Sequence, residues 1–219
     1  MTNDSSTTLA AVLWDLDGTL IDTEPLWLDA EHELARTHGK TWTQEDGLKL
    51  VGNTLLESGI YIQRRLDIDM EPAAIVDYLV ERLVRRLREE IIWRPGAREL
   101  INAFHAEGVP MALVTMSYAA IADPIARQLP FSAVVTGDVV THGKPHPEPY
   151  LRAALMLGVD PADCLAIEDS GTGANSANAA GCQVLVVPNF VTVPDAPRRN
   201  FLSTLEGVKP ASLRALMGN

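Results

Sequence analysis

Apolar residues follow two different patterns along the chain. Residues 9–14 form a short apolar run that ends at Asp15-Leu16-Asp17-Gly18-Thr19, which is typical of a buried parallel strand followed by a turn. From residue 23 to residue 90 the apolar residues recur at helical spacing. The clearest helical stripe consists of Ile75, Val76, Leu79, Val80, Leu83, Val84 and Leu87. No strand pattern interrupts this region, so we expect a small helical bundle there.

After Arg94-Pro95-Gly96 the helical and strand patterns alternate. We expect strands over residues 109–115, 133–136, 164–167 and 183–187, and helices over 97–106, 118–128, 147–157, 173–180 and 211–217. Residues 189–209 are rich in proline and polar residues and are predicted to form a loop. Repeated αβ units predict a parallel sheet covered on both faces. We therefore predict an α/β core from residues 9–21 and 94–219, a helical cap inserted at 22–93, and a flexible tail at 1–8.

Composition and charge narrow the class of protein. Hydrophobic residues make up 47% and charged residues 21% of 219, which excludes wholesale disorder, and two cysteines are too few for a disulfide scaffold. The net charge of −11 disfavours nucleic acid and anionic membranes as partners. No apolar stretch reaches the roughly 20 residues of a membrane span, and the N-terminus lacks a secretory pattern. We expect a cytoplasmic monomer with reduced thiols.

Polar residues follow the ends of the predicted strands, where active sites of parallel sheets lie. They are Asp15, Asp17, Thr115, Lys144, Glu168 and Asp169. Crowded carboxylates repel one another unless a cation lies between them, and Mg²⁺ prefers oxygen ligands while keeping room for a substrate phosphate. A hydroxyl and an ammonium group could bind the phosphoryl oxygens. One Asp carboxylate could then attack phosphorus while a second carboxyl group protonates the leaving oxygen.

Four segments also resemble the motifs of the haloacid dehalogenase superfamily, in the family's order. They are Trp14-Asp15-Leu16-Asp17-Gly18-Thr19-Leu20, Ala112-Leu113-Val114-Thr115, Gly143-Lys144-Pro145-His146-Pro147-Glu148-Pro149-Tyr150, and Ala166-Ile167-Glu168-Asp169-Ser170. The resemblance implies a Rossmann-like parallel core. Its inserted helical segment is similar to the cap of the subgroup that contains sugar-phosphate phosphatases and β-phosphoglucomutase.

The resemblance also implies a role for each residue. Asp15 would be the nucleophile and Asp17 the general acid and then base. Mg²⁺ would be bound by Asp15, the backbone carbonyl of Asp17, Asp169, and Glu168 directly or through water. Thr115 and Lys144 would bind the phosphate, and Glu24, Trp27 and Ser117 are candidate substrate contacts. The implied activity is Mg²⁺-dependent hydrolysis of a small phosphorylated metabolite, a sugar or polyol phosphate, through an aspartyl-phosphate.

Two alternatives to a phosphatase remain. A β-phosphoglucomutase-like enzyme carries a His after the first motif and a Lys-Asn pair after the second, where this chain has Trp27 and Ser117-Tyr118-Ala119. A mutase must hold two phosphates, and a second cationic cradle is not evident, so hydrolysis is favoured. A phospho-accepting signalling or regulatory module also combines carboxylates, a Thr and a Lys around Mg²⁺. Receiver domains, however, are shorter and lack an inserted cap.

Two histidines, His142 and His146, flank the Gly143-Lys144-Pro145 turn. Two histidines around such a turn are more typical of loop residues than of a metal site. The sequence alone therefore assigns them no function.

Overall fold

The computed structural model describes residues 9–218, and the tail predicted at residues 1–8 lies outside the described residues. Its centre is a six-stranded sheet in the order β3-β2-β1-β4-β5-β6, with every neighbouring pair parallel. The strands are β1 (Ala11–Trp14), β2 (Met111–Val114), β3 (Ala133–Val135), β4 (Cys164–Glu168), β5 (Gln183–Val186) and β6 (Arg199–Phe201). The parallel α/β core predicted from the alternating pattern is confirmed.

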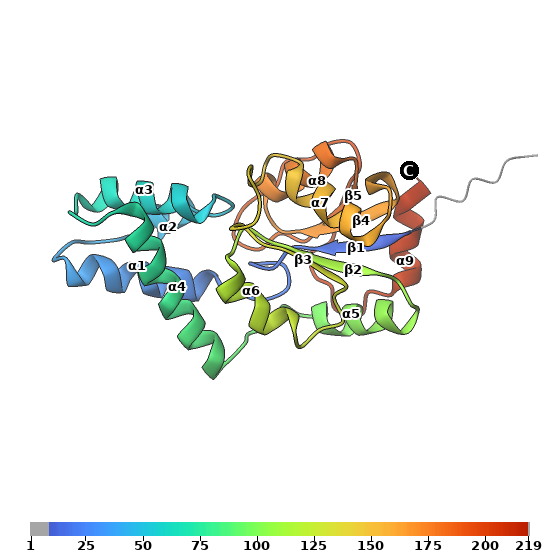
Figure 1. The fold of residues 1–219 in the computed structure, drawn as a ribbon. Coiled ribbons are helices and arrows are strands. Elements are labelled where there is room, and N and C mark those ends of the chain that lie inside the picture. Colours follow the sequence, from blue (N-terminus) through green and yellow to red (C-terminus); the bar gives the residue numbers. More distant parts are fainter. Residues whose placement is uncertain (1–8, 219) are drawn as a thin grey trace, which may run out of the picture.

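Helices cover both faces of this sheet, which explains why the central strands are apolar throughout. Figure 1 shows α7 (Glu148–Leu157) and α8 (Gly171–Ala180) on one face, and α5 (Ala97–Ala106) and α6 (Ala119–Ala126) on the other. Alternate residues of β1 enter the two cores: Leu13 packs with α7 and α8, whereas Trp14 packs with α5 and α6. All four residues of β1 are fully buried. The sheet is therefore anchored from both sides.

The first four helices after β1 form a bundle at one end of the molecule (Figure 1). They are α1 (Glu24–Thr37), α2 (Gln44–Leu48), α3 (Leu55–Leu66) and α4 (Pro72–Glu89). Helix α4 buries Ile75, Leu79 and Leu83, the stripe that the sequence indicated, against its neighbours. None of the described helices combines the length and the apolar character that crossing a membrane requires.

Two adjacent segments connect this helical bundle to the sheet. Ile21 forms a bridge with Trp93, the amide of Asp22 donates to the carbonyl of Ile92, and the amide of Arg94 donates to the carbonyl of Leu20. The paired segments leave β1 and return toward α5 side by side. The exact division into core and cap stays a prediction.

Several elements differ from the sequence prediction. Strand β6 lies within residues 189–209, so the loop predicted there is wrong at this point; Arg199, Asn200 and Phe201 are partly exposed at the sheet edge and have no apolar pattern. Helix α2 was not predicted, although Thr43 and Asp46 form a capping box at its start. The last α-helix, α9 (Pro210–Arg214), is followed by a 3₁₀ turn, η2 (Ala215–Gly218). A second short 3₁₀ turn, η1 (Pro161–Asp163), precedes β4.

Gly96, the residue before the first turn of α5, generates a testable prediction about stability. Gly96 has a φ of 78°, and a Cβ there would lie 2.2 Å from the carbonyl carbon and oxygen of Leu205. Gly108 has a similar φ of 71° but no atom within 4 Å of its Cβ position. We expect Gly108→Ala to lower the free energy of unfolding by about 1–2 kcal/mol, the strain of the left-handed region. Gly96→Ala should lower it further, because the backbone of Leu205 must also move. Urea unfolding measures both, and equal losses would contradict the prediction.

Candidate active site

The sheet order brings the predicted site residues together. Strand β1 lies between β2 and β4, so the residues that leave the carboxyl ends of these three strands converge. Asp15 and Asp17 follow β1, Thr115 follows β2, and Asp169 follows Glu168 at the end of β4. The Asp15 amide donates to the carbonyl of Ile167 at 3.0 Å, which extends the pairing of β1 with β4 by one residue.

Lys144 enters this cluster from the loop between β3 and α7. Its Nζ donates to Asp15 Oδ1 at 2.7 Å, to Glu168 Oε1 at 2.6 Å and to the carbonyl of Val114 at 3.0 Å. The side chain is buried, and burial alone would lower the pKa of Lys144, but the carboxylates of Asp15 and Glu168 outweigh burial and raise that pKa. The buried ammonium therefore stays charged and links the ends of β1, β2 and β4.

Three buried carboxyl groups form an acidic cluster around this ammonium. One oxygen from each of Asp15, Glu168 and Asp169 lies within 4.8 Å of the others. Burial, and then the charge of Glu168, raises the pKa of Asp15 to about 7. Burial and the charge of Asp15 likewise raise the pKa of Asp169 well above its ordinary value. Hard oxygen ligands with uncompensated negative charge suit Mg²⁺, so the donor set fits the metal that the family resemblance implies.

Asp17 lies at the junction between the sheet and the helical bundle. Its Oδ1 accepts from Thr23 Oγ1 at 2.7 Å and from Trp27 Nε1 at 3.4 Å, and its Oδ2 accepts from Thr115 Oγ1 at 3.1 Å and Ser117 Oγ at 2.8 Å. The amide of Ser117 also donates to Thr115 Oγ1 at 2.9 Å. The Thr115 hydroxyl thus contacts Asp17. The four donors fix the orientation of this carboxylate.

A cavity opens above these residues, between the sheet and the helical bundle. The core contributes Asp15, Asp17, Ser117, Lys144 and Asp169 to its lining, and the bundle contributes Glu24, Trp27, Glu31, Asn53 and Ser58. Apolar side chains of Leu50, Val51, Leu55, Val76 and Leu79 complete the wall. The cavity therefore contains the three residues predicted as substrate contacts, Glu24, Trp27 and Ser117.

Sequence reasoning missed the part played by Glu31. This residue is buried in the bundle, lines the cavity and accepts from Trp42 Nε1 at 2.8 Å. Burial raises the pKa of Glu31 to about 8 despite that hydrogen bond, and burial with the charge of Asp17 raises the pKa of Glu24 to about 7. Glu31 follows Trp27 by one helical turn, and this spacing was the available signal.

Two residues beneath the cluster were also missed. The hydroxyl of Tyr150, a buried residue of α7, donates to Glu168 Oε1 at 2.5 Å. Gly173 in α8 leaves room for the same carboxylate, because a Cβ there would lie 2.0 Å from Glu168 Oε1. Glu168 is fully buried, with Lys144 and Tyr150 both donating to Oε1. Tyr150 belongs to the third motif, but the sequence does not indicate which residue it contacts.

Comparisons with known proteins agree with this geometry. A family model described as haloacid dehalogenase-like hydrolase matches residues 9–181. The phosphorylated carbohydrates phosphatase of Thermotoga maritima is 33% identical over 187 residues, which cover 80% of this chain and 83% of that protein. The bifunctional riboflavin kinase/FMN phosphatase of Arabidopsis thaliana is 36% identical over 197 residues, covering 87% of this chain and 51% of that protein. This chain therefore spans about half the length of the Arabidopsis relative.

The solved structures include a similar fold. A variant of CbbY from Rhodobacter sphaeroides in complex with xylulose-(1,5)bisphosphate superposes with a TM-score of 0.83 at 28% identity, covering 94% of this chain and 99% of that one. The family model covers most of the chain, including all four motifs and the residues of the buried cluster. The chain belongs to the haloacid dehalogenase-like hydrolase family.

Proposed function

We propose that this chain is a Mg²⁺-dependent phosphatase that hydrolyses a sugar or polyol monophosphate through an aspartyl-phosphate on Asp15. The broader class, a phosphoric monoester hydrolase, follows from the family match and from relatives named as phosphatases. The observation that carries the finer proposal is the buried contact of Lys144 with Asp15 and Glu168, beside Asp169 and facing the cavity. This contact supports the proposal because the candidate nucleophile, an ammonium group and the candidate metal ligands lie together there.

The acidic cluster supplies the ligands for the metal in this proposal. Asp15, Asp169 and the backbone carbonyl of Asp17 would hold Mg²⁺, with Glu168 acting directly or through water. Bound Mg²⁺ would neutralise phosphate charge. Glu168 is fully buried and already accepts from Lys144 and Tyr150, which favours a supporting role in which it holds both the ammonium and the cluster in position.

The protein residues account for both chemical steps of the proposed hydrolysis. A carboxylate oxygen of Asp15 attacks phosphorus while Lys144 exchanges its hydrogen bond to Asp15 for one to a phosphoryl oxygen, and the bond from phosphorus to the leaving oxygen breaks. In its protonated form Asp17, held at the cavity by Thr23 and Ser117, gives its proton to that leaving oxygen. The resulting carboxylate then takes a proton from a water whose oxygen attacks phosphorus, the bond from phosphorus to Asp15 breaks, and inorganic phosphate leaves.

The cavity lining supports an uncharged, hydroxyl-rich leaving group. Among the described residues that line it, Lys144 is the only one with a cationic side chain, and that ammonium is already paired with Asp15 and Glu168. The wall from the helical bundle instead offers the carboxyl groups of Glu24 and Glu31 and the polar groups of Asn53 and Ser58. Carboxyl groups exchange hydrogen bonds with hydroxyls, and the described residues of this wall offer no cationic group to pair with a second phosphate. This lining argues against a mutase.

The alternative of a phospho-accepting regulatory module is weaker. Such a module needs a long-lived phosphorylated aspartate, whereas Asp17 is positioned two residues from Asp15 with its carboxylate at the cavity. An acid/base group at that position favours rapid turnover.

The role of the nucleophile is tested by Asp15→Asn. The substitution keeps the size of the side chain but removes the attacking charge, so hydrolysis of a hexitol phosphate should fall to background. Rapid quenching with labelled substrate should trap phosphate on the wild-type chain only. Asp29→Asn, at an exposed carboxylate of α1, is the control and should retain activity. Substantial turnover by a folded Asp15→Asn variant would exclude the covalent mechanism.

Removal of the metal tests the acidic cluster. EDTA should abolish phosphate release and Mg²⁺ should restore it, because one ammonium cannot neutralise both the carboxylates and the substrate. Ca²⁺ should not restore full activity, since it takes more ligands at longer distances and misplaces the phosphate. Phosphate release is measured at fixed substrate with each ion. Undiminished activity in EDTA would contradict the proposed site.

The leaving-group dependence of Asp17→Asn tests the general acid. We expect a loss of about 10²–10⁴-fold in kcat for hexitol phosphate, the usual contribution of general acid–base catalysis. The loss should be smaller for p-nitrophenyl phosphate, whose leaving group needs no proton. Equal losses for both substrates would remove Asp17 from the acid role. With the wild-type chain, conversion of β-glucose 1-phosphate to glucose 6-phosphate faster than phosphate release would favour the mutase.

A further inference from the structure

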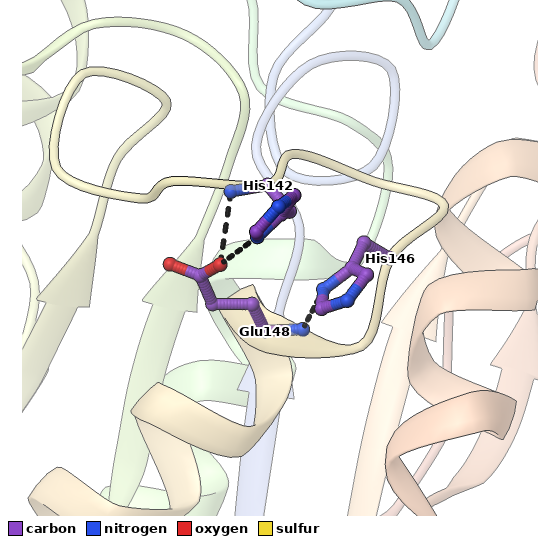
Figure 2. Close-up of side chains that lie close together, drawn as sticks. All are labelled: His142, His146 and Glu148. Carbon is purple, nitrogen blue, oxygen red and sulfur yellow. Dashed lines mark hydrogen bonds and ion pairs between the residues drawn. The ribbon is translucent and has the colours of Figure 1, made fainter.

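A second cluster of metal-ligating side chains lies on the segment that carries Lys144. Figure 2 shows His142, His146 and Glu148 around this turn, and one ligand atom from each lies within 4.8 Å of the others. The two histidines stand two residues on either side of Lys144, and Glu148 is the first residue of α7. None of the three lines the cavity, and the proposed phosphatase reaction uses none of them. In the folded chain Glu148 lies beside the two histidines, to which the sequence alone assigned no function.

Glu148 orients the first of these histidines. Its carboxylate accepts from the amides of Thr141 at 2.7 Å and His142 at 2.9 Å, and Oε2 lies 3.0 Å from Nδ1 of His142. A carboxylate can only accept hydrogen bonds, so Nδ1 of His142 carries the proton and donates it. A metal ion bound by Nδ1 would take the place of this proton, with Oε2 of Glu148 beside it as a second ligand. An imidazole nitrogen and a carboxylate oxygen 3.0 Å apart can serve as neighbouring ligands of one ion.

The second histidine is held by its backbone and by the start of α7. Its carbonyl accepts from Ser176 Oγ at 2.6 Å, and its Nδ1 accepts from the amide of Glu148 at 3.2 Å, a hydrogen bond that an ion at Nδ1 would replace. The ring centroids of His142 and His146 are 4.6 Å apart. The rings therefore lie close enough for one nitrogen of each to reach the same ion.

The donor set determines which cation fits. Two imidazole nitrogens and one carboxylate oxygen suit borderline transition metals such as Zn²⁺, Co²⁺ or Ni²⁺, whereas Mg²⁺ and Ca²⁺ require mostly oxygen. The side chain of His142 is 61% exposed and that of Glu148 is 24% exposed, so an ion can enter from solvent and the side chains can rotate to converge on it. We propose that His142, His146 and Glu148 form a second metal site, for Zn²⁺ or a similar ion, distinct from the acidic cluster.

A metal ion at this site would stabilise the turn that positions Lys144. The metal would join residues 142 and 146 across that turn, whose other contacts are already tight. The amide of Lys144 donates to Met116 Sδ at 3.2 Å, and a Cβ at Gly143 would lie 2.7 Å from Thr54 Cγ2 of the helical bundle. A ligand that binds only the folded chain raises its stability. Bound Zn²⁺ therefore raises the midpoint of thermal unfolding.

A measurement of zinc binding tests this proposal without an activity assay. The result therefore does not depend on whether the proposed phosphatase reaction is correct. Zn²⁺ is titrated calorimetrically into an Asp169→Asn background, with excess Mg²⁺ present, so that the acidic cluster does not compete. We expect one saturable Zn²⁺ site in this background. His142→Ala and His146→Ala should each abolish it, and Glu148→Gln should weaken it by at least about 10-fold, because a neutral amide oxygen replaces a charged ligand.

Matched controls separate loss of the site from loss of the fold. His105→Ala removes an exposed histidine of α5 that belongs to no such cluster among the described residues, and it should leave binding unchanged. Thermal unfolding without metal establishes whether each variant is folded. Where an alanine variant is unfolded, His142→Gln or His146→Gln is used in its place. Zn²⁺ should raise the unfolding midpoint only in chains that keep both histidines. Binding that persists without both histidines, or that disappears with Asp169→Asn alone, would overturn the proposal.

Discussion

The buried ion pair of Lys144 with Asp15 and Glu168 is the constraint on which the rest of the site depends. Removing an ammonium and two carboxylates from water is costly unless each finds a close partner, so this contact demands exact positions from distant parts of the chain. Lys144 and Asp15 are 129 residues apart in sequence, yet Nζ and Oδ1 lie 2.7 Å apart. The order of strands, with β1 between β2 and β4, is what makes that meeting possible.

Other residues position the carboxylates that surround this contact. Tyr150 donates to Glu168 from below, and Gly173 lets α8 approach that carboxylate, since any Cβ would overlap it. On the other side, Thr23 and Trp27 of the bundle hold Asp17 toward the cavity, while Ser117 and Thr115 hold it from the sheet. Asp17 thus accepts hydrogen bonds from both the helical bundle and the sheet. Any movement of the helical bundle relative to the sheet would change the contacts of this carboxylate.

The sequence predicted those features that leave a local pattern. Strands β1 and β4 are apolar runs followed by acidic residues, and the stripe of α4 has helical spacing, so their positions and the residues at the strand ends could be inferred. Strand β6 could not, because Arg199, Asn200 and Phe201 pair through backbone atoms at a half-exposed edge. The contacts of Tyr150 and Glu31 are likewise non-local. Their partners, Glu168 and Trp42, are set by packing that no local pattern records.

Charge balance explains why the proposed chemistry needs more than the protein supplies. Four carboxyl groups, those of Asp15, Asp17, Glu168 and Asp169, surround the single ammonium of Lys144, on a chain whose net charge is −11. The pKa of Asp15 is raised to about 7 first by burial and then by Glu168, even with Lys144 in direct contact, so the ammonium does not offset the surrounding charge. A phosphate ester adds further negative charge beside it. In the proposed reaction a divalent cation would therefore accompany the substrate, and the leaving group would bring no second anion.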